Sequence, residues 1–146
     1  MKAGLDPHGE ALAADTGADR NALLASIVDS SDDAIIGATT DGVVTSWNRG
    51  AEMVYGYGAA EMLGRSMSLL LPDDRQDEMD EVLQRVAGGE RVQHHETTRR
   101  RKDGAAISVS LTASPIVGRG GQVTGVAIVA RDITERRRAD EQLLAA

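Results

Sequence analysis

The chain has 146 residues, 41% hydrophobic and 27% charged, which is typical of one globular domain with its own core. Its formal net charge of −7 argues against a nucleic-acid-binding surface, and the absence of cysteine excludes disulfides, cysteine-bound metals and thiolate chemistry. No apolar run approaches the ~20 residues that span a bilayer, and the N-terminus lacks the basic-then-apolar order of a secretory signal, so we expect a cytoplasmic protein.

The N-terminal segment divides at Asp19. Residues 1–18 are rich in Ala, Gly and Asp without a sustained period, and we expect a flexible tail there. Asp19 is a candidate N-cap, and the residues after it predict an amphipathic helix over 19–31. The apolar stripe of this helix could cover the protein's own sheet or a second subunit, and we favour a homodimer. Its members are Leu23, Leu24, Ile27 and Val28.

A β-hairpin is predicted next. Two β-rich runs, 34–39 and 43–47, flank Asp41 and Gly42. Asp-Gly between such runs is a strong hairpin signal, because a type I′ turn needs positive φ at both central positions. The sequence therefore predicts two antiparallel strands joined by a type I′ turn.

Three helices should follow the hairpin. Asn48 is the candidate N-cap of a short helix, and a second short helix covers 59–63. A longer helix opens at Asp73, which with Gln76 three positions later resembles a capping box. Its apolar stripe ends at Gly88, a residue type common at helix ends.

The last third of the chain reads as three strands and a helix. Residues 92–101 predict a polar strand, and residues 105–115 alternate between apolar and hydroxyl side chains, as a strand with one buried face does. Residues 123–131 are apolar on both faces, which is typical of a covered central strand. Residues 135–146 turn to Glu, Arg, Ala and Leu and predict a helix. Strands joined by hairpins and segregated from helices imply an α+β fold around an antiparallel sheet.

This order of elements resembles that of a PAS domain. The matching segments are DSSDDAIIGATTDGVVTSWNRGAEMVYGY (29–57), EMLGRSMSLLLPDD (61–74), RRKDGAAISVSLTASPI (100–116) and GVAIVARDITERRRADEQL (125–143). The resemblance implies a five-stranded antiparallel sheet in the order 2-1-5-4-3, with short helices over one face and residues 32–134 as the core. It also implies a sensor or dimerisation module in a larger signalling protein, with a downstream effector of the kinase, cyclase or phosphatase type.

The resemblance implies roles for single residues as well. Asp132, Ile133 and Thr134 match the family's Asp-Ile-Thr triplet, where the last strand becomes a helix that could begin a coiled coil. Either Asp132 or Thr134 could cap that helix. An acidic residue of the first short helix often pairs with the basic residue of the Lys-Asp-Gly turn, which predicts an ion pair between Glu52 and Lys102.

A ligand cavity in this fold would lie between the sheet and the short helices. Its expected lining is mostly aliphatic and contains several Met, a side chain that adapts to varied shapes. A lipid or fatty-acid-like ligand is therefore one hypothesis, and a self-filled core in a ligand-free interaction domain is the other. The candidate residues are Ile36, Val44, Trp47, Asn48, Met53, Tyr57, Met62, Leu63, Met67, Leu70, Met79, Leu83, Leu111 and Ile128.

Other cofactors are limited by what the chain lacks. A flavin–thiol adduct and the chromophore of photoactive yellow protein both require a cysteine. A haem-binding relative typically uses a His in the long helix, where this chain has none, and Met79 is better explained as core. A non-covalent flavin near Trp47 and Asn48 stays open, as in a redox sensor.

No enzymatic site is predicted. His94, His95 and Glu96 are consecutive on an expected strand, so the two imidazoles should point to opposite faces and cannot easily share one metal ion. The serines of residues 105–115 have no His partner in view that would activate them as nucleophiles. We therefore expect a non-enzymatic domain.

Overall fold

The structure, a computed structural model, describes the backbone of residues 7–145 and the side chains of residues 19–144. Helix α1 (Pro7–Ser30) belongs to one compact unit, and the residues from Ser31 onward form another. Residues 7–18, for which we expected a flexible tail, are helical and form the first part of α1, while residues 1–6 lie outside the described part. The alanines among residues 7–18 favour a helix, and Pro7 suits the first helical position, where no N–H is needed.

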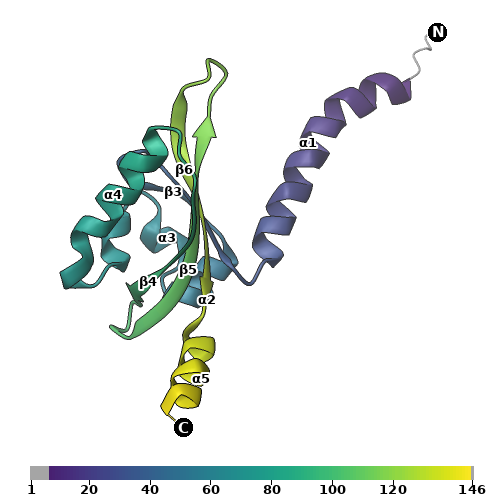
Figure 1. Ribbon diagram of the computed structural model, residues 1–146. Helices are drawn as coiled ribbons and strands as arrows, with labels where there is room; N and C mark the ends of the chain where they lie inside the picture. The colour runs from purple at the N-terminus through teal and green to yellow at the C-terminus, as the bar shows by residue number, and fades with distance from the viewer. Residues whose placement is uncertain (1–6, 146) are drawn as a thin grey trace. The chain divides into compact units, whose positions relative to one another are not determined.

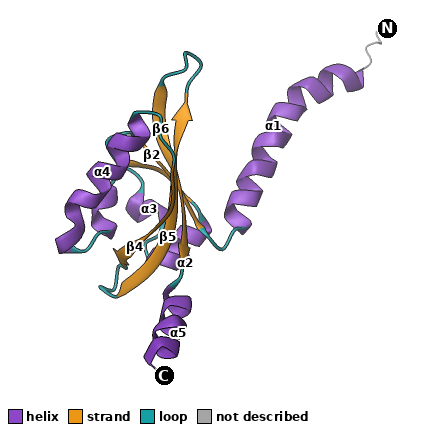
Figure 2. Ribbon diagram, in the orientation of Figure 1, coloured by secondary structure: helices purple, strands orange, loops and turns teal. Residues whose placement is uncertain are grey.

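The second unit contains a five-stranded antiparallel sheet and short helices (Figures 1 and 2). The sheet order is β3-β2-β6-β5-β4, which confirms the predicted order and the α+β fold. The elements are β2 (Ala34–Ala38), β3 (Val44–Trp47), α2 (Arg49–Tyr55), α3 (Ala59–Met62), two 3₁₀ turns (Met67–Leu70 and Asp73–Arg75), α4 (Gln76–Ala87), β4 (Val92–Arg100), β5 (Ala106–Val117), β6 (Val123–Asp132) and α5 (Thr134–Ala145).

One face of the sheet forms the core with α2, α3 and α4. Strand β5 alternates as predicted, with Ile107, Val109, Leu111 and Ala113 buried and the intervening hydroxyl residues only partly buried. Strand β6 is central in the sheet, but it is not covered on both faces, because 40% of Val129 is exposed. The sheet therefore has a core face, which packs against α4, and an open face.

The three hairpin turns share one geometry. In each, the fourth residue is a glycine with φ between 82° and 89°, and its N–H donates to the carbonyl of the first residue. Asp41 and Asp103 do not have positive φ, so the predicted type I′ turn is wrong. A type I turn followed by a left-handed residue needs glycine only at the last position. The turns are Thr39–Gly42, Arg101–Gly104 and Gly118–Gly121.

The predicted capping box at the start of α4 is also wrong. Asp73 lies in a 3₁₀ turn before α4, its carboxylate pairs with Arg100 at 3.3 Å, and the N-cap position of α4 is Arg75. Gln76 is the first residue of α4, and its side-chain amide donates to the carbonyl of Leu71 at 3.0 Å. Within residues 7–145, no helix combines the length and the apolar character needed to cross a membrane.

Candidate functional site

Most of the predicted pocket residues lie together in the core between the sheet and the helices. Tyr57 packs against this core and is partly buried. Two predictions are wrong, since Met53 is 68% exposed and Leu63 is 49% exposed. Met53 lies on the side of α2 away from its buried face, and Leu63 follows the last residue of α3. The predicted residues buried in the core are Ile36, Val44, Trp47, Met62, Met67, Leu70, Met79, Leu83, Leu111 and Ile128.

Asn48 holds three segments together. Its side-chain oxygen accepts hydrogen bonds from the backbone N–H groups of Ala51 and Ile35, both at 2.8 Å, and its amide donates to the carbonyl of Asp33 at 3.1 Å. This confirms Asn48 as the N-cap of α2, where it satisfies an N–H that the helix itself cannot pair. These three bonds go to backbone groups of Asp33, Ile35 and Ala51, and they tie the end of β3 to β2 and α2.

A polar cluster centred on Glu78 joins α4 to the core face of β4. Oxygen Oε2 of Glu78 accepts from the Thr97 hydroxyl at 2.8 Å and from Nη1 of Arg99 at 3.1 Å. Its Oε1 lies 2.8 Å from Nε2 of His95. Burial alone would raise the pKa of Glu78, but the hydrogen bonds from Thr97 and His95 and the charge of Arg99 hold this pKa below its usual value.

Arg99 is the functional candidate that the sequence did not reveal. It is 1% exposed, although three basic residues, Arg100, Arg101 and Lys102, follow it directly. The alternation of strand residues could have indicated its burial, because Thr97 and Arg99 are two residues apart and lie on the same strand face.

Tyr55 is a second buried residue that the sequence analysis did not single out. It is buried, its ring centroid lies 5.6 Å from that of Trp47, and burial raises its pKa to about 12 despite the nearby charge of Arg99.

The two adjacent histidines of β4 point to opposite faces, as predicted. The register shifts between Val92 and His95, and His94 adopts a φ of 52°. His95 reaches Glu78 on α4, whereas His94 lines a hollow on the open face. The irregular backbone thus separates the imidazoles.

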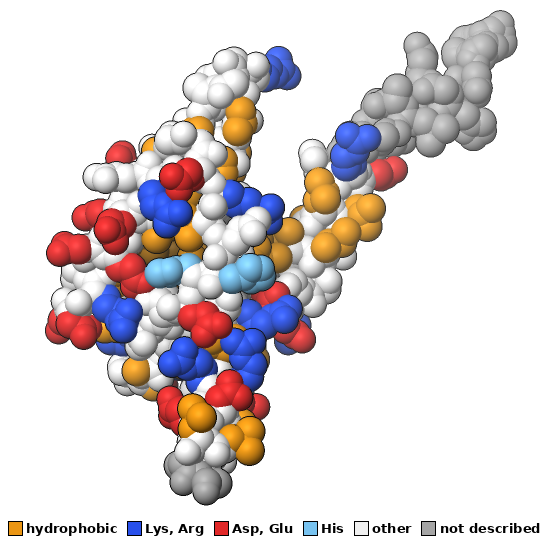
Figure 3. Space-filling view, viewed as in Figure 1, with side chains coloured by type: hydrophobic (Ala, Val, Ile, Leu, Met, Phe, Trp, Pro, Cys, Tyr) orange, Lys and Arg blue, Asp and Glu red, His pale blue; other side chains and the backbone are white. Residues whose placement is uncertain are grey.

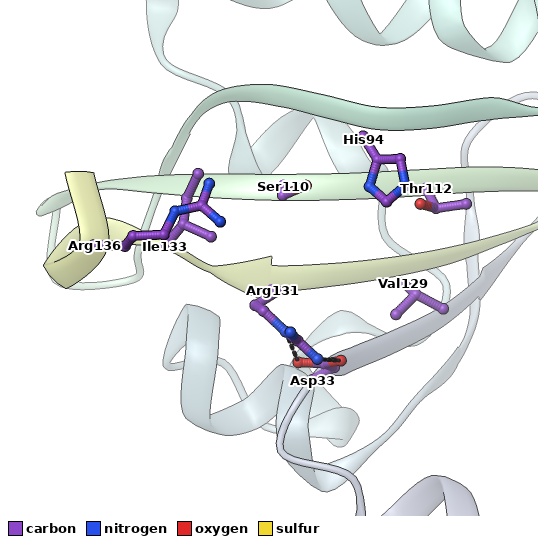
Figure 4. Close-up of a pocket in the computed structure, with 8 residues that line it drawn as sticks. All are labelled: Asp33, His94, Ser110, Thr112, Val129, Arg131, Ile133 and Arg136. Carbon is purple, nitrogen blue, oxygen red and sulfur yellow. Dashed lines mark hydrogen bonds and ion pairs between the residues drawn. The ribbon is translucent and has the colours of Figure 1, made fainter. Parts of the chain in front are cut away.

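The hollow on the open face has a volume of about 360 Å³ (Figure 4). Arg131 spans it and binds both carboxylate oxygens of Asp33, each at 3.1 Å. This polar, open hollow lies away from the expected apolar pocket, because its β5 residues alternate with the buried ones. Its lining residues are Asp33, His94, Ser110, Thr112, Val129, Arg131, Ile133 and Arg136.

The predicted ion pair between Glu52 and Lys102 is wrong. The ammonium of Lys102 pairs with Glu61 at 2.5 Å, and the hydrogen bond from Lys102 is the main cause that lowers the pKa of Glu61. The carboxylate of Glu52 instead accepts from the backbone N–H of Ala59 at 2.8 Å. Glu52 thus satisfies an unpaired N–H at the start of α3, a favourable place for a carboxylate.

The triplet Asp132, Ile133 and Thr134 forms a hydrogen-bonded joint. Strand β6 ends at Asp132 and α5 begins at Thr134, so only Ile133 separates them. The N–H of Ile133 donates to the carbonyl of Ser108 at 2.8 Å, and the Thr134 hydroxyl accepts from the Ser108 N–H at 3.0 Å. Asp132 accepts from the Thr134 N–H at 2.9 Å, so its carboxylate satisfies an N–H at the start of α5 that the helix itself cannot pair.

Glu96 braces the first turn of α5 from the neighbouring edge of the sheet. Its carboxylate oxygens lie 3.0 Å from Arg136 Nη2 and 3.1 Å from Arg137 Nη1. Figure 3 shows acidic and basic side chains lying next to one another around the junction with α5. The start of α5 is therefore held by Ser108 of β5 and by Glu96 of β4.

The predicted interface residues lie on α1. Leu23, Leu24 and Ile27 are 60%, 53% and 54% exposed, and Val28 is partly buried. Apolar side chains clustered at an exposed helix surface often mark an interaction site. The homodimer interface stays a prediction.

The sequence of the chain matches one family model and is similar to a known signalling protein. The family model described as PAS fold matches residues 22–133. Two-component system protein A of Emericella nidulans is 34% identical over 106 residues, which cover 72% of this chain and 15% of that protein. The chain thus spans about 15% of the length of this relative.

Solved structures share the fold. A PAS domain of a protein from Colwellia psychrerythraea matches with a TM-score of 0.72 and 27% identity, covering 77% of this chain and 96% of that one. An RNA-binding Light-Oxygen-Voltage receptor matches with a TM-score of 0.74 and 28% identity, covering 86% and 37%. A domain of a sensory box sensor histidine kinase/response regulator from Geobacter sulfurreducens has a TM-score of 0.66 and 21% identity, covering 77% and 94%, and shows the fold alone.

Proposed function

Because the chain belongs to the PAS fold family, we propose that it is a non-enzymatic sensory and dimerisation module of a larger signal-transduction protein. The curated relative supports the setting, since it is a two-component system protein. We infer a downstream effector of the kinase, cyclase or phosphatase type, reached through α5.

The observation that carries this proposal is the joint between β6 and α5. Strand β6 contributes Ile128 and Ala130 to the core, so a change in the core would displace it. The single residue Ile133 then leads into α5, and its N–H is bonded to Ser108. A displacement of β6 would reach α5 because no loop lies between them to absorb it.

We further propose that the stimulus is an apolar small molecule bound between the sheet and the helices. Met62, Met67 and Met79 support this, because methionine side chains can rearrange around a guest. The sheet beneath them presents small side chains at Ala113 and Ala130. Native mass spectrometry and solvent extraction of the purified chain should then reveal an apolar species at a stoichiometry of one. An empty protein would favour the ligand-free interaction domain.

A non-covalent flavin is the second candidate, favoured by the likeness to a Light-Oxygen-Voltage receptor. Cysteine-adduct photochemistry is excluded, because the chain contains no cysteine. An absorption spectrum between about 300 and 600 nm distinguishes the candidates, since flavins absorb there and lipids do not. Flavin bands in the purified protein would replace the apolar ligand with a redox or light-sensing cofactor.

The proposed signal path is tested in the full-length protein by lengthening the joint. Two glycines inserted after Thr134 should leave the fold intact and uncouple the effector from the stimulus. Two glycines inserted after Gly121, in the turn between β5 and β6, lengthen the chain equally and should leave the coupling unchanged. A stimulus response that survives the first insertion would refute transmission through this joint.

A further inference from the structure

Arg99 leaves a hydrogen-bond donor without a partner inside the core. Its Nη1 donates to Glu78 at 3.1 Å and to the carbonyl of Thr98 at 3.0 Å. Its Nη2 is buried and is the one buried side-chain nitrogen or oxygen in the described part of the chain that finds no hydrogen-bond partner. Buried donors in native proteins are nearly always paired, and guanidinium donors are costly to leave unpaired. The position therefore calls for an acceptor.

Charge points to an anionic acceptor. Arg75 and Arg99 face one carboxylate, that of Glu78, and the side chain of Arg99 is 2% exposed whereas that of Arg75 is 44% exposed. Both oxygens of Glu78 are already engaged, one by His95 and one by Thr97 and Arg99. The cluster thus carries one positive charge in excess of its carboxylate when His95 is neutral.

On the core face, Arg99 lies between the Glu78 cluster and a set of apolar and aromatic side chains. Ile107 is its cross-strand partner on β5, and both residues lie on the buried face. The charge of Arg99 acts on the buried phenol of Tyr55, whose pKa of about 12 keeps it protonated at neutral pH. Tyr55 in turn contacts Trp47. An acceptor at Nη2 would meet the cationic donor that Glu78 engages through Nη1, and it would lie near the buried side chains of Ile107 and Tyr55.

We propose that Arg99 binds the carboxylate of an amphipathic ligand whose apolar tail lies between the sheet and the helices. This rests on the apolar-ligand function proposed above and adds the chemical class of the head group. A carboxylate carries one negative charge and matches the single positive excess. Guanidinium is the side chain best shaped to bind a carboxylate. A phosphate, with up to two charges and more oxygens, would exceed what one free donor and one excess charge can satisfy.

The purified 146-residue chain, with bound lipid removed, tests this with tetradecanoic acid and 1-tetradecanol. The two probes share a tail length and differ at the head group. A charged hydrogen bond in the core should make the acid bind about ten- to a hundredfold more tightly by titration calorimetry or native mass spectrometry. The acid should also raise the midpoint of thermal unfolding more than the alcohol does at equal concentration.

Two variants test whether Arg99 causes the preference for the acid over the alcohol. Arg99→Met keeps a long side chain without charge and should bind acid and alcohol alike. Arg100→Met is the matched control, because the neighbouring Arg100 pairs with the exposed Asp73 at 3.3 Å. The control should keep the preference for the acid. A preference for the acid that persists in Arg99→Met would overturn the assignment.

The outcomes in the native sequence separate the two proposals even if Arg99→Met does not fold. Equal affinity for acid and alcohol would overturn the carboxylate site and leave the apolar ligand standing. Binding of neither probe would overturn both. Tight binding of the acid with weak binding of the alcohol supports both, and loss of the preference in Arg99→Met but not in Arg100→Met assigns the effect to Arg99.

Discussion

The hydroxyl of Thr134 accepts a hydrogen bond from the backbone N–H of Ser108 at 3.0 Å, so the first residue of α5 is fixed to β5. Ser108 also accepts from the N–H of Ile133 through its carbonyl. One residue of β5 thus holds both residues that follow β6. The direction in which α5 leaves the sheet is set by backbone hydrogen bonds as well as by side-chain packing.

Thr134→Val should weaken this joint. The substitution keeps the shape of the side chain but leaves the Ser108 N–H without its acceptor, which costs about 1–2 kcal/mol of unfolding free energy. Urea denaturation measures the loss, and hydrogen exchange of the α5 amides should accelerate. Thr134→Ser retains the hydroxyl and is the control. Equal stability of the valine variant and the native protein would show that this hydrogen bond contributes nothing.

Glu96→Gln should loosen α5 with little effect on global stability. The variant removes the charge that holds Arg136 and Arg137, while exposed ion pairs contribute only about 0–1 kcal/mol each. We expect faster hydrogen exchange in α5 and an unfolding midpoint close to that of the native protein. Glu90→Gln removes a comparable exposed pair, with Arg85, and should leave α5 exchange unchanged. Identical exchange in both variants would argue against a bracing role for Glu96.

Acid should destabilise the fold through Glu78. The pKa of Glu78 in the folded protein lies below its ordinary value of 4.5, so its contribution is complete above that value and is lost as the pH falls through the folded-state pKa. Glu78→Gln should therefore show a shallower loss of stability below about pH 4.5. At neutral pH it should cost at least about 2 kcal/mol, because Arg99 loses its carboxylate.

Glu81→Gln removes a carboxylate from the exposed side of α4 and is the control for this pH experiment. Unfolding free energies measured between about pH 2 and pH 7 compare the two variants with the native protein. If the unfolding free energy of Glu78→Gln falls as steeply with decreasing pH as that of the native protein, Glu78 is not the group responsible for the acid sensitivity.

Gly50→Ala should destabilise the domain strongly. A Cβ at position 50 would lie 2.1 Å from the carbonyl oxygen of Asp33, and a backbone carbonyl cannot move aside as a side chain can. We expect a loss of about 2 kcal/mol or more in thermal or urea unfolding. Gly88→Ala, whose Cβ would meet its nearest neighbour at 3.5 Å, should change stability little. Similar effects at the two glycines would contradict the close approach of α2 to Asp33.

Leu24→Asp combined with Ile27→Asp should produce a monomer if α1 forms the proposed dimer. Both side chains are more than half exposed in the single chain, so the charges should not disturb the fold of the other unit. Light scattering coupled to size exclusion measures the mass. The substitution Ala22→Asp, at an exposed position on the side of α1 opposite the apolar stripe, is the control. A dimer that survives the double substitution would place the interface elsewhere.

The sheet could be predicted because its signals are local. The alternation from Ile107 to Ala113 and the Asp-Gly turns each specify a strand or hairpin within about ten residues of sequence. The turn type was missed because Asp-Gly occurs both in two-residue type I′ loops and in longer loops, where a type I turn is followed by a left-handed glycine. The prediction that β6 is covered on both faces failed because apolar side chains, such as that of Val129, can also lie on an exposed face of a sheet.

The site was harder to predict because its contacts join distant residues. Arg99 meets Glu78 from 21 residues away, and nothing in a run of basic residues shows that one of them is buried. Lys102 was expected to pair with Glu52, but Glu52 accepts from the N–H of Ala59 at the start of α3, and Lys102 pairs with Glu61 instead. The sequence could not show that Val54 is buried and Met53 exposed, because the side of α2 that faces the core was not known.

The distance between α4 and α5 tests the rigid joint most directly. The sequence contains no cysteine, so cysteines introduced at the exposed positions Asp80 and Gln142 are the only sites for spin labels. Pulsed electron resonance should give one narrow distance distribution in the native sequence and a broad one after two glycines are inserted behind Thr134. A distribution that is already broad without the insertion would contradict a joint that transmits displacement from β6 to α5.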